Sequence, residues 1–229
     1  MDTIKSVNDQ TYKSIEHIFI DSNSIDDTLE IIQNNSTRDL KIISEPDKGI
    51  YEAMNKGVRI ATGDFICFLN SDDFYANKYV IETVAKYFSL QDIDTVYGNI
   101  DYVSEENIYK RTFKAPNNFK KVLSGYQIPH PAFFLKTSIL KNMDYPFDPC
   151  LKIASDIGQQ IYLASNYEIK ARKINGSLVM MRTGGISGNF FNRIIGWLET
   201  AKVFNQITKR NGMIFLVRKI LNNVLSAFI

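Results

Sequence analysis

The stretch FICFLNSDDFY, residues 65–75, joins an apolar run to a cluster of polar and acidic side chains. Its first five residues are hydrophobic, which predicts a strand over 64–70 that is buried on both faces of a sheet. The strand runs directly into Asn70, Ser71, Asp72 and Asp73. Such residues either turn the chain and cap the next helix, as Asp and Asn often do, or they face a ligand.

Strands and helices alternate on both sides of this stretch. Apolar runs predict further strands at 15–21, 40–45 and 94–100. Helical periodicity predicts helices at 26–35, 50–63 and 78–88, with Ser24 as N-cap of the first and Gly63 closing the second. This alternation is typical of βαβ units and a parallel sheet flanked by helices.

The second half is less regular. It predicts short strands at 108–113 and 132–136, a helix at 154–165, and a final pair of helices at 190–210 and 213–228. The last helix is amphipathic. One side carries Arg218, Lys219, Asn222, Asn223 and Ser226, and the other carries Ile214, Val217, Leu221, Val224, Leu225 and Phe228. It either packs on its own domain or lies on a membrane surface.

Composition bounds the class of protein. A chain of 229 residues with 45% hydrophobic residues is globular. The balance of 27 basic and 25 acidic residues argues against nucleic-acid binding driven by bulk charge. Cys67 and Cys150 form no CxxC pair, which favours a reducing cytosol. The polar residues after Met1 do not resemble a signal peptide, and no window predicts a membrane-spanning helix.

Acidic residues follow three consecutive predicted strands. They are Asp21, then Glu45 and Asp47, then Asp72 and Asp73. Ligands of open parallel sheets bind beyond the carboxyl ends of the strands, and carboxylates gathered there repel one another unless a cation lies between them. Oxygen ligands without His or Cys suit Mg²⁺ or Mn²⁺. The sequence therefore predicts a site for a metal-bound nucleotide or diphosphate, although neither a P-loop nor a GxGxxG motif is present.

Several of these stretches together resemble the family-2 glycosyltransferases of the GT-A fold. The matching stretches are SVNDQTYKSIEHIFIDSNSIDDT, SEPDKGIYEAMNKGVRIATGDFICFLNSDD, HPAFF, FDPCLKIASD and GGIS. The resemblance implies a GT-A-like, mostly parallel mixed α/β sheet flanked by helices. It also implies transfer of a sugar from a nucleotide-sugar donor with inversion at the anomeric carbon.

The resemblance assigns the donor site to residues near the strand ends. Asp21 matches the acid that recognises the nucleotide base, and Asp47 matches a second residue of the nucleotide pocket. NSDD stands at the family's DxD motif, with Asn70 at its first position. Asn70 and Ser71 would contact the donor, and Asp72 would bind the Mg²⁺ or Mn²⁺ that bridges the diphosphate. We expect the neighbouring Asp73 to be a helix-capping residue.

The resemblance also implies roles in the second half of the chain. Asp156, in IASD, matches the candidate general base, with a helix N-cap as the alternative. His130, in IPHPAFF, lies either near the donor diphosphate or acceptor or in an ordinary loop. The segment 183–187, TGGIS, is either a turn or a lid that closes over the donor, with Arg182 near phosphate.

One strand of the family pattern has no match here. The family begins with an additional strand and a turn that holds the nucleotide base, whereas this chain begins with MDTIKSVNDQTY, which matches the helix after that strand. We therefore expect the first strand to be missing, with strand edges left unpaired and a core face open.

The expected function is a metal-dependent inverting glycosyltransferase. Residues 1–188 would form the GT-A domain, with a nucleotide-binding half at 1–100 and an acceptor half at 101–188, followed by amphipathic helices at 189–229. The donor would be a UDP-sugar, with GDP and dTDP left open. The acceptor would be a polysaccharide or lipid-linked glycan, and no nucleic acid is expected. The protein would be located in the cytoplasm, and at the inner membrane surface if residues 213–229 contact the membrane.

Two other functions stay open from the sequence. The first is a non-catalytic remnant of a glycosyltransferase. It would bind a partner or glycan but would not catalyse transfer, because the first strand is missing. The second is another Mg²⁺-dependent nucleotide enzyme, such as a nucleotidyltransferase. That enzyme would need a phosphate loop rich in Gly, Arg or Lys after its first strand, which this chain does not show.

Overall fold

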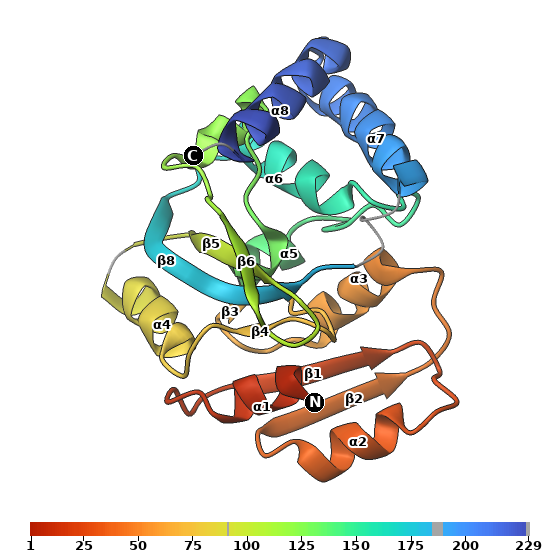
Figure 1. Cartoon of the computed structure of the whole chain (residues 1–229), viewed down its shortest axis with the longest axis vertical. Coiled ribbons are helices and arrows are strands. Elements are labelled where there is room, and N and C mark those ends of the chain that lie inside the picture. Colours follow the sequence, from red (N-terminus) through yellow and green to blue (C-terminus); the bar gives the residue numbers. More distant parts are fainter. Residues whose placement is uncertain (91, 185–189, 228–229) are drawn as a thin grey trace.

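The computed structural model describes residues 1–90, 92–184 and 190–227, with side chains as far as Asn222. It is an α/β fold with a small two-stranded sheet at one end, a larger sheet in the middle and two long helices at the other end (Figure 1). The predicted mixed sheet flanked by helices and the predicted C-terminal helical pair are confirmed. Among the described residues, no helix combines the length and apolarity needed to cross a membrane.

The small sheet pairs β1 (Glu16–Asp21) with β2 (Asp39–Ser44) in parallel, from Glu16 beside Asp39 to Asp21 beside Ser44. The crossover between the two strands contains α2 (Thr28–Asn35), as the alternation predicted. The preceding helix α1 (Asp2–Asn8) is tied to β2 by Arg38, whose guanidinium donates to the carbonyl oxygens of Val7, Asn8 and Gln10.

The larger sheet has the strand order β3-β7-β5-β8-β4, with β6 also paired to β5. Its strands are β3 (Phe65–Ile66), β4 (Phe74–Tyr75), β5 (Thr95–Val103), β6 (Tyr109–Phe113), β7 (Phe133–Lys136) and β8 (Ala171–Arg182). The long central strand β5 pairs in parallel with β8 and antiparallel with β6 and β7. The β3–β7 and β4–β8 ladders are also antiparallel, so the second half of the chain makes the sheet mixed.

The expected unpaired strand edges are present. Within the described ranges, β1 has a ladder to β2 alone, and β3 has a ladder to β7 alone. β3 is confined to two residues, and Cys67 to Asn70 follow it without a ladder or regular secondary structure. The predicted strand over 64–70 is therefore shorter than its apolar run.

Side chains on the two faces of the larger sheet form two apolar cores, because successive residues of a strand point to opposite faces. On one face Tyr97 and Phe133 pack under α3 (Ile50–Ile60), α5 (Thr137–Lys141) and α6 (Ser155–Asn166). On the other face Val96 and Phe134 pack under α4 (Val80–Leu90).

The helical pair α7 (Phe190–Thr208) and α8 (Gly212–Ala227) packs on α6 through a third core. Phe204 and Phe215 stack with ring centroids 3.9 Å apart. The helices meet closely at Gly212, where an added Cβ would lie 1.9 Å from the carbonyl oxygen of Ala201. A larger residue at Gly212 would therefore separate the two helices.

Several local predictions are wrong. The helix predicted over 50–63 ends at Ile60, so Gly63 lies beyond it. The N-cap of α2 is Asp27, because the hydroxyl of Ser24 donates to Asp21 instead. The twelve-residue strand β8 was missed, because its first half is polar and exposed and shows no clear alternation.

Candidate functional site

A cavity of about 1560 Å³ runs through the middle of the molecule, and we call it the central cavity. It is lined by β1, α3, residues 64–72, the segment around His130, and parts of α6, α7 and α8. Six of the predicted site residues line it: Asn70, Ser71, Asp72, His130, Asp156 and Arg182. Asp21 and Asp47 are not among the lining residues.

The loop Asn70–Asp73 is held in place from three directions. The backbone closes a turn from the amide of Asp73 to the carbonyl oxygen of Asn70 at 3.1 Å. The Thr3 hydroxyl of α1 donates to the Ser71 carbonyl oxygen at 2.6 Å. Arg182, at the end of β8, donates to the Asp72 carbonyl oxygen at 3.1 Å. These contacts use backbone oxygens of the loop and leave the Asp72 side chain free to face the cavity.

Asp73 is buried inside the loop. Its carboxylate accepts a hydrogen bond from the Asn70 side-chain amide at 2.8 Å and one from the Arg182 backbone amide at 3.3 Å. Burial raises the pKa of Asp73 to about 6, with the Asn70 hydrogen bond opposing that rise and the nearby Asp72 carboxylate adding to it. The expectation of a helix cap is wrong, because α4 begins at Val80, well beyond this turn.

Asp72 has the opposite environment. It is exposed at the rim of the central cavity, and no described residue donates a hydrogen bond to its carboxylate. In the described part of the chain, no group of three His, Cys, Asp or Glu residues is arranged as a metal site. One free carboxylate still fits Mg²⁺ or Mn²⁺, because these ions take one or two protein carboxylates and complete their shell with phosphate and water.

Arg182 forms an ion pair and hydrogen bonds at the edge of the site. Its guanidinium binds the Asp2 carboxylate and donates to the Asn107 side-chain oxygen at 2.9 Å. The Arg182 ion pair and hydrogen bond lower the pKa of Asp2. Arg182 lines the central cavity, and through these contacts it also connects α1, the Asn107 turn and the NSDD loop. The predicted phosphate contact of Arg182 stays a prediction.

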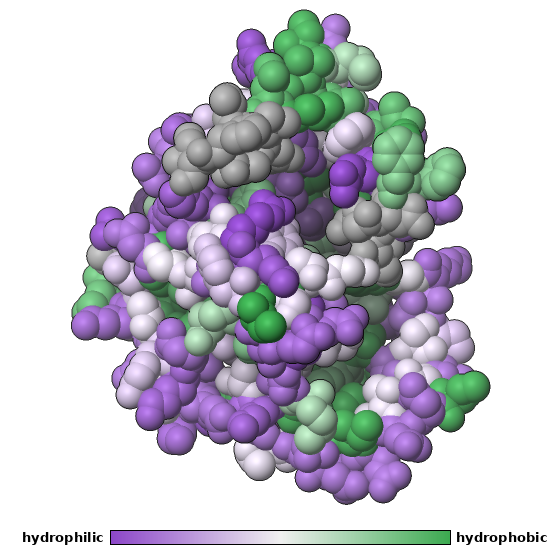
Figure 2. Space-filling model, viewed as in Figure 1, coloured by the Kyte–Doolittle hydropathy of each residue, from purple (hydrophilic) through white to green (hydrophobic). Residues whose placement is uncertain are grey.

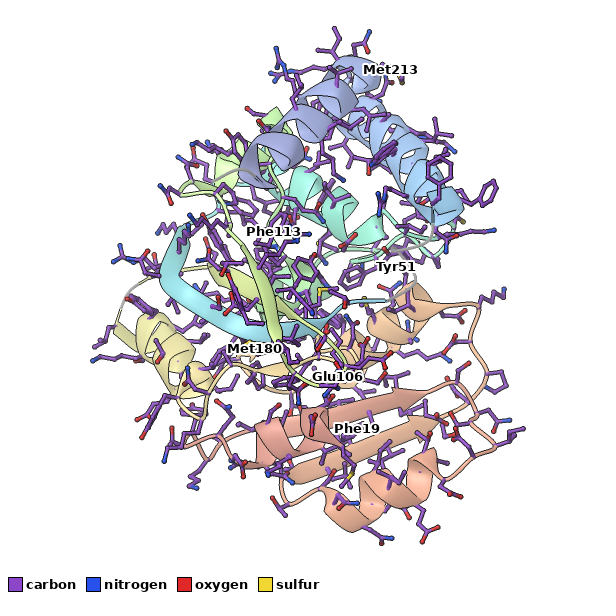
Figure 3. All side chains as sticks on the ribbon, viewed as in Figure 1. Phe19, Tyr51, Glu106, Phe113, Met180 and Met213 are labelled. Carbon is purple, nitrogen blue, oxygen red and sulfur yellow. The ribbon has the colours of Figure 1, made fainter. Side chains whose placement is uncertain are left out.

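Asp156 lies in the first turn of α6 and faces the central cavity. The N-cap of α6 is Ala154, so Asp156 does not have the capping role that was its alternative. The buried Tyr51, from α3, points toward α6 (Figure 3) and donates its hydroxyl to the Asp156 carboxylate at 3.4 Å. Burial, together with the charge of Asp156, raises the pKa of Tyr51, so this hydroxyl keeps its proton.

His130 lines the same cavity and is 8% exposed. Its ring stacks on Phe68 at a centroid distance of 5.2 Å, and its Nε2 has no hydrogen-bond partner among the described residues. Burial lowers the pKa of His130 and outweighs the opposing charge of Asp156, so the neutral imidazole is favoured. A neutral ring with a free nitrogen facing a cavity can exchange a hydrogen bond with a bound substrate.

A carboxylate from α7 fixes the loop that leads to Asp156. Glu199 accepts hydrogen bonds from the backbone amides of Lys152, Ile153 and Ala154 at 2.9, 2.9 and 3.1 Å. Such amides at a helix start otherwise lack partners. Close packing supports the same junction, because a Cβ on Gly196 would lie 2.9 Å from the Ile153 side chain. The helix pair therefore holds the start of α6, and with it Asp156, in position.

Asp21 and Asp47 lie at the strand ends but have local hydrogen bonds. The Asp21 carboxylate is 7% exposed and accepts from the hydroxyls of Ser24 and Ser44 at 2.5 and 2.6 Å. Burial opposes its ionisation, but these hydrogen bonds lower the pKa of Asp21 overall. Asp47 accepts from the Gly49 amide at 2.9 Å in a turn. Their nucleotide-binding roles stay predictions.

Sequence reasoning assigned no site role to several cavity residues, among them Tyr51, Lys152, Arg193, Trp197 and the buried cation Lys219. Tyr51 is in the matched stretch GIYEAMNKG, but an apolar helix face predicts simple packing there. Lys219 belongs to the side of α8 that was predicted to be polar, yet it is 8% exposed. The apolar stripe of α8 is exposed instead, so the helix does not pack on its own domain through that stripe. Thr183 and Gly184 form a turn, while 185–187 of the predicted lid lie outside the described residues.

Comparison with known proteins decides the family. Residues 2–143 match the model of Glycosyl transferase family 2. The chain belongs to this family and is a glycosyltransferase. A relative from Escherichia coli, UDP-Glc:alpha-D-GlcNAc-diphosphoundecaprenol beta-1,3-glucosyltransferase WfaP, is 28% identical over 84% of this chain and 76% of its own length. A PGL/p-HBAD biosynthesis glycosyltransferase from Mycobacterium bovis is 26% identical over 83% of this chain and 74% of its own.

Solved structures show the same fold. S. aureus TarS in complex with UDP-GlcNAc has a TM-score of 0.70 at 17% identity, over 95% of this chain and 66% of that chain. The mannosyltransferase PcManGT from Pyrobaculum calidifontis, in complex with GDP-Man and Mn2+, has a TM-score of 0.65 at 14% identity, over 93% of this chain and 63% of that chain. This family-2 chain thus spans about two thirds of the glycosyltransferase structures that it resembles.

Proposed function

We propose that this family-2 glycosyltransferase moves a sugar, with inversion, from a UDP-sugar to a hydroxyl group of a lipid-linked or polysaccharide glycan. The observation that carries the proposal is a single cavity with the free carboxylate of Asp72 at one part of its wall and that of Asp156 at another. Donor binding needs the first group, and activation of the acceptor needs the second. The remnant alternative is not favoured, because the matched relatives are named as glycosyltransferases.

In the proposed reaction, Asp156 takes the proton from the acceptor hydroxyl as its oxygen attacks the anomeric carbon. The bond between that carbon and the donor diphosphate breaks on the opposite face, and the nucleotide leaves as the diphosphate. A positioned carboxylate of this kind contributes about 10²- to 10⁴-fold in rate. Tyr51 donates to the Asp156 carboxylate and keeps it oriented toward the cavity, and His130 offers a neutral nitrogen to the bound substrate.

Asp72 is the residue that would hold a divalent metal beside the donor. When bound, Mg²⁺ or Mn²⁺ supplies charge stabilisation to the departing diphosphate. Asn70 and Ser71 line the cavity next to Asp72 and would contact the donor through neutral groups. The complexes of related folds with UDP-GlcNAc and with GDP-Man and Mn2+ support a donor of this chemical class.

The outer face of α8 supports peripheral contact with a membrane. Its apolar residues Met213, Ile214, Val217 and Leu221 are 54–57% exposed. Figure 2 shows hydrophobic residues gathered at this end of the molecule, where Figure 1 draws α7 and α8. Lys209, Arg210 and Arg218 are exposed around the stripe and would attract an anionic bilayer. Sedimentation with anionic vesicles tests this contact, which equal recovery of wild type and a Val217→Glu, Leu221→Glu variant would contradict.

Transfer itself is tested by incubating the chain with UDP-, GDP- and dTDP-sugars and a lipid-linked sugar acceptor. Mass spectrometry would show the acceptor gaining the mass of one sugar residue, and NMR would show an anomeric configuration opposite to that of the donor. A retained configuration would contradict inversion, and no mass gain with any donor would contradict the transfer reaction.

A further inference from the structure

The central cavity has two ends of opposite chemistry. Near the NSDD loop the cavity is lined by the free carboxylate of Asp72 and by Arg182, whose charge is paired with Asp2. The part lined by α6, α7 and α8 contains Lys152, Arg193 and Lys219 beside Asp156. The Glu199 carboxylate of the same region is occupied by three backbone amides. The α6–α8 end is therefore basic overall.

Lys219 is the distinctive group at this end. It lines the cavity, is 8% exposed, and makes one long hydrogen bond of 3.5 Å to the Thr200 hydroxyl. Burial lowers the pKa of Lys219 to about 8, while the charge of Asp156 opposes that shift. A buried ammonium group with so little hydrogen bonding is costly unless an anion completes its environment.

The backbone fixes where this ammonium group lies. Gly125 has φ of +87°, and a Cβ there would lie 2.7 Å from the backbone nitrogen of Lys219. Residue 125 must therefore be glycine for α8 to approach this closely. The Asn222 side chain, one turn later, donates to the Ser124 carbonyl oxygen at 3.1 Å. The Ser124–Gly125 segment thus fixes the position of α8 at Lys219, whose side chain lines the cavity.

We propose that Lys219, with Arg193 and Lys152, binds the phosphate groups of an acceptor whose sugar is linked to a lipid through a diphosphate. This inference rests on the proposed function. In a sugar-1-diphosphate the attacking hydroxyl and the diphosphate belong to the same sugar, so the general base and the phosphate-binding cation must line one cavity, as Asp156 and Lys219 do. Charge-assisted hydrogen bonds to phosphate suit these side chains.

The outer side of the same helix fits this acceptor class. Met213 lies at the outer end of the helical pair (Figure 3), and Val217 and Leu221 continue the exposed apolar stripe. α8 therefore presents an ammonium group to the cavity and apolar side chains to its surroundings. A phosphate group and a hydrocarbon chain of one substrate would each meet the matching side of α8.

The test compares Lys219→Met with Lys202→Met, a control that removes an exposed cation from α7. Two synthetic acceptors carry the same sugar and the same alkyl chain, one joined through a diphosphate and the other through a neutral glycosidic ether. We expect Lys219→Met to raise KM for the diphosphate acceptor by about tenfold or more, the effect of losing one charge-assisted contact. KM for the neutral acceptor and for the donor should stay unchanged.

Equal losses with both acceptors would overturn the proposal, because Lys219 would then act on Asp156 or on the packing of α8. Circular dichroism and thermal unfolding establish that both variants are folded.

A second measurement does not depend on transfer. Calorimetric titration with inorganic pyrophosphate in EDTA at pH 7 should show binding to wild type and to Lys202→Met, and binding about tenfold weaker to Lys219→Met. If wild type transfers sugar to neither acceptor but binds pyrophosphate through Lys219, the phosphate site is supported and the proposed function is contradicted. If wild type does not bind pyrophosphate, the phosphate site is contradicted.

Discussion

Three aspartates near the central cavity differ in what surrounds their carboxylates. Asp73 is buried and hydrogen-bonded within its own loop, Asp72 is exposed and free, and Asp156 receives one hydroxyl from Tyr51. Asp72 and Asp73, which are adjacent at the end of the apolar run, therefore have different roles. Asp73 shapes the turn, and this leaves Asp72 available to a ligand.

Asp156→Asn tests the assignment of the general base. Asparagine keeps the size of the side chain but cannot take a proton, so we expect donor binding to persist while the transfer rate falls by about 10²- to 10⁴-fold. Single-turnover kinetics with saturating donor measures the rate. The exposed Asp144→Asn serves as control. Transfer at the parental rate by Asp156→Asn would show that another group is the base.

We expect the protein to lose stability in mild acid because of His17, on β1. Its Nδ1 is buried and has no hydrogen-bond partner among the described residues, and burial together with the charge of Arg38 lowers the pKa of His17 to about 4. Above pH 6.5 the residue is neutral in both states. As the pH falls toward 4, His17 becomes protonated in the unfolded chain but stays neutral in the folded chain. The free energy of unfolding therefore decreases over this interval.

His17→Gln should remove that titration. Urea unfolding at pH 7 and pH 5 should show the variant losing about 1–2 kcal/mol less stability than wild type over the interval, after allowance for partial exposure of the ring. Parallel losses in the two proteins would contradict a lowered pKa at His17.

At the scale of single elements, the start of α6 depends on α7. Glu199 satisfies the three amides before the first turn, and Gly196 permits the close approach of the two helices. The position of Asp156 is consequently set by a residue 43 positions further along the chain.

Glu199→Ala should therefore weaken both stability and catalysis. Loss of the carboxylate leaves amides without partners and should lower the free energy of unfolding by about 1–3 kcal/mol. Transfer should fall through kcat more than through the donor KM, because the base moves and the NSDD loop does not. Chemical unfolding and steady-state kinetics measure the two effects, with the exposed Glu168→Ala as control. A variant with wild-type kcat would contradict this positioning role.

The elements also show what the sequence could predict. Apolar runs and helical periodicity located β1, β2, β5, α6 and the helical pair, because burial imposes a regular pattern on those segments. β8 escaped prediction because its polar first half has no such pattern. Two alternatives were open for α8, packing on its own domain or lying on a membrane surface. Its apolar stripe is exposed, so the helix does not pack on the domain through that stripe. Tertiary contacts with α7 and Gly125 bury Phe215, Leu216 and the cation Lys219 instead.

The candidate site was predicted in outline by its strand ends. Asn70, Ser71 and Asp72, which follow an apolar run predicted as a strand, line the central cavity. Asp156, which was expected from the family resemblance alone, lines the same cavity from the first turn of α6. The expected acid cluster did not extend to Asp21, because Ser24 and Ser44 surround its carboxylate. Hydrogen bonds between residues distant in sequence, such as that of Tyr51 to Asp156, are absent from any local pattern.

At the scale of the whole molecule, the fold is built from two sheets that share no ladder among the described residues. The central cavity passes between them, with β1 lining one side and residues 65–69 the other. Most β1 and β2 residues are partly exposed, whereas most β5 residues are buried. The small sheet should therefore open more easily than the larger one.

Hydrogen exchange followed by mass spectrometry tests this difference. Amides in peptides covering β1 and β2 should exchange through openings of lower free energy than those covering β5 and β7, because few strand contacts restrain the small sheet. Uniform protection across the two sheets would show that they unfold as one cooperative unit and would contradict the expectation.

The proposed donor site at the NSDD loop is tested by calorimetric titration of wild type and Asp72→Ala with UDP, in the presence and absence of Mn²⁺. We expect UDP binding that requires Mn²⁺, persists in Asp156→Asn and is lost in Asp72→Ala, because the donor diphosphate and its metal would meet the chain at the NSDD loop. Equal binding by wild type and Asp72→Ala, or no binding of UDP, GDP or dTDP by the wild type, would contradict it.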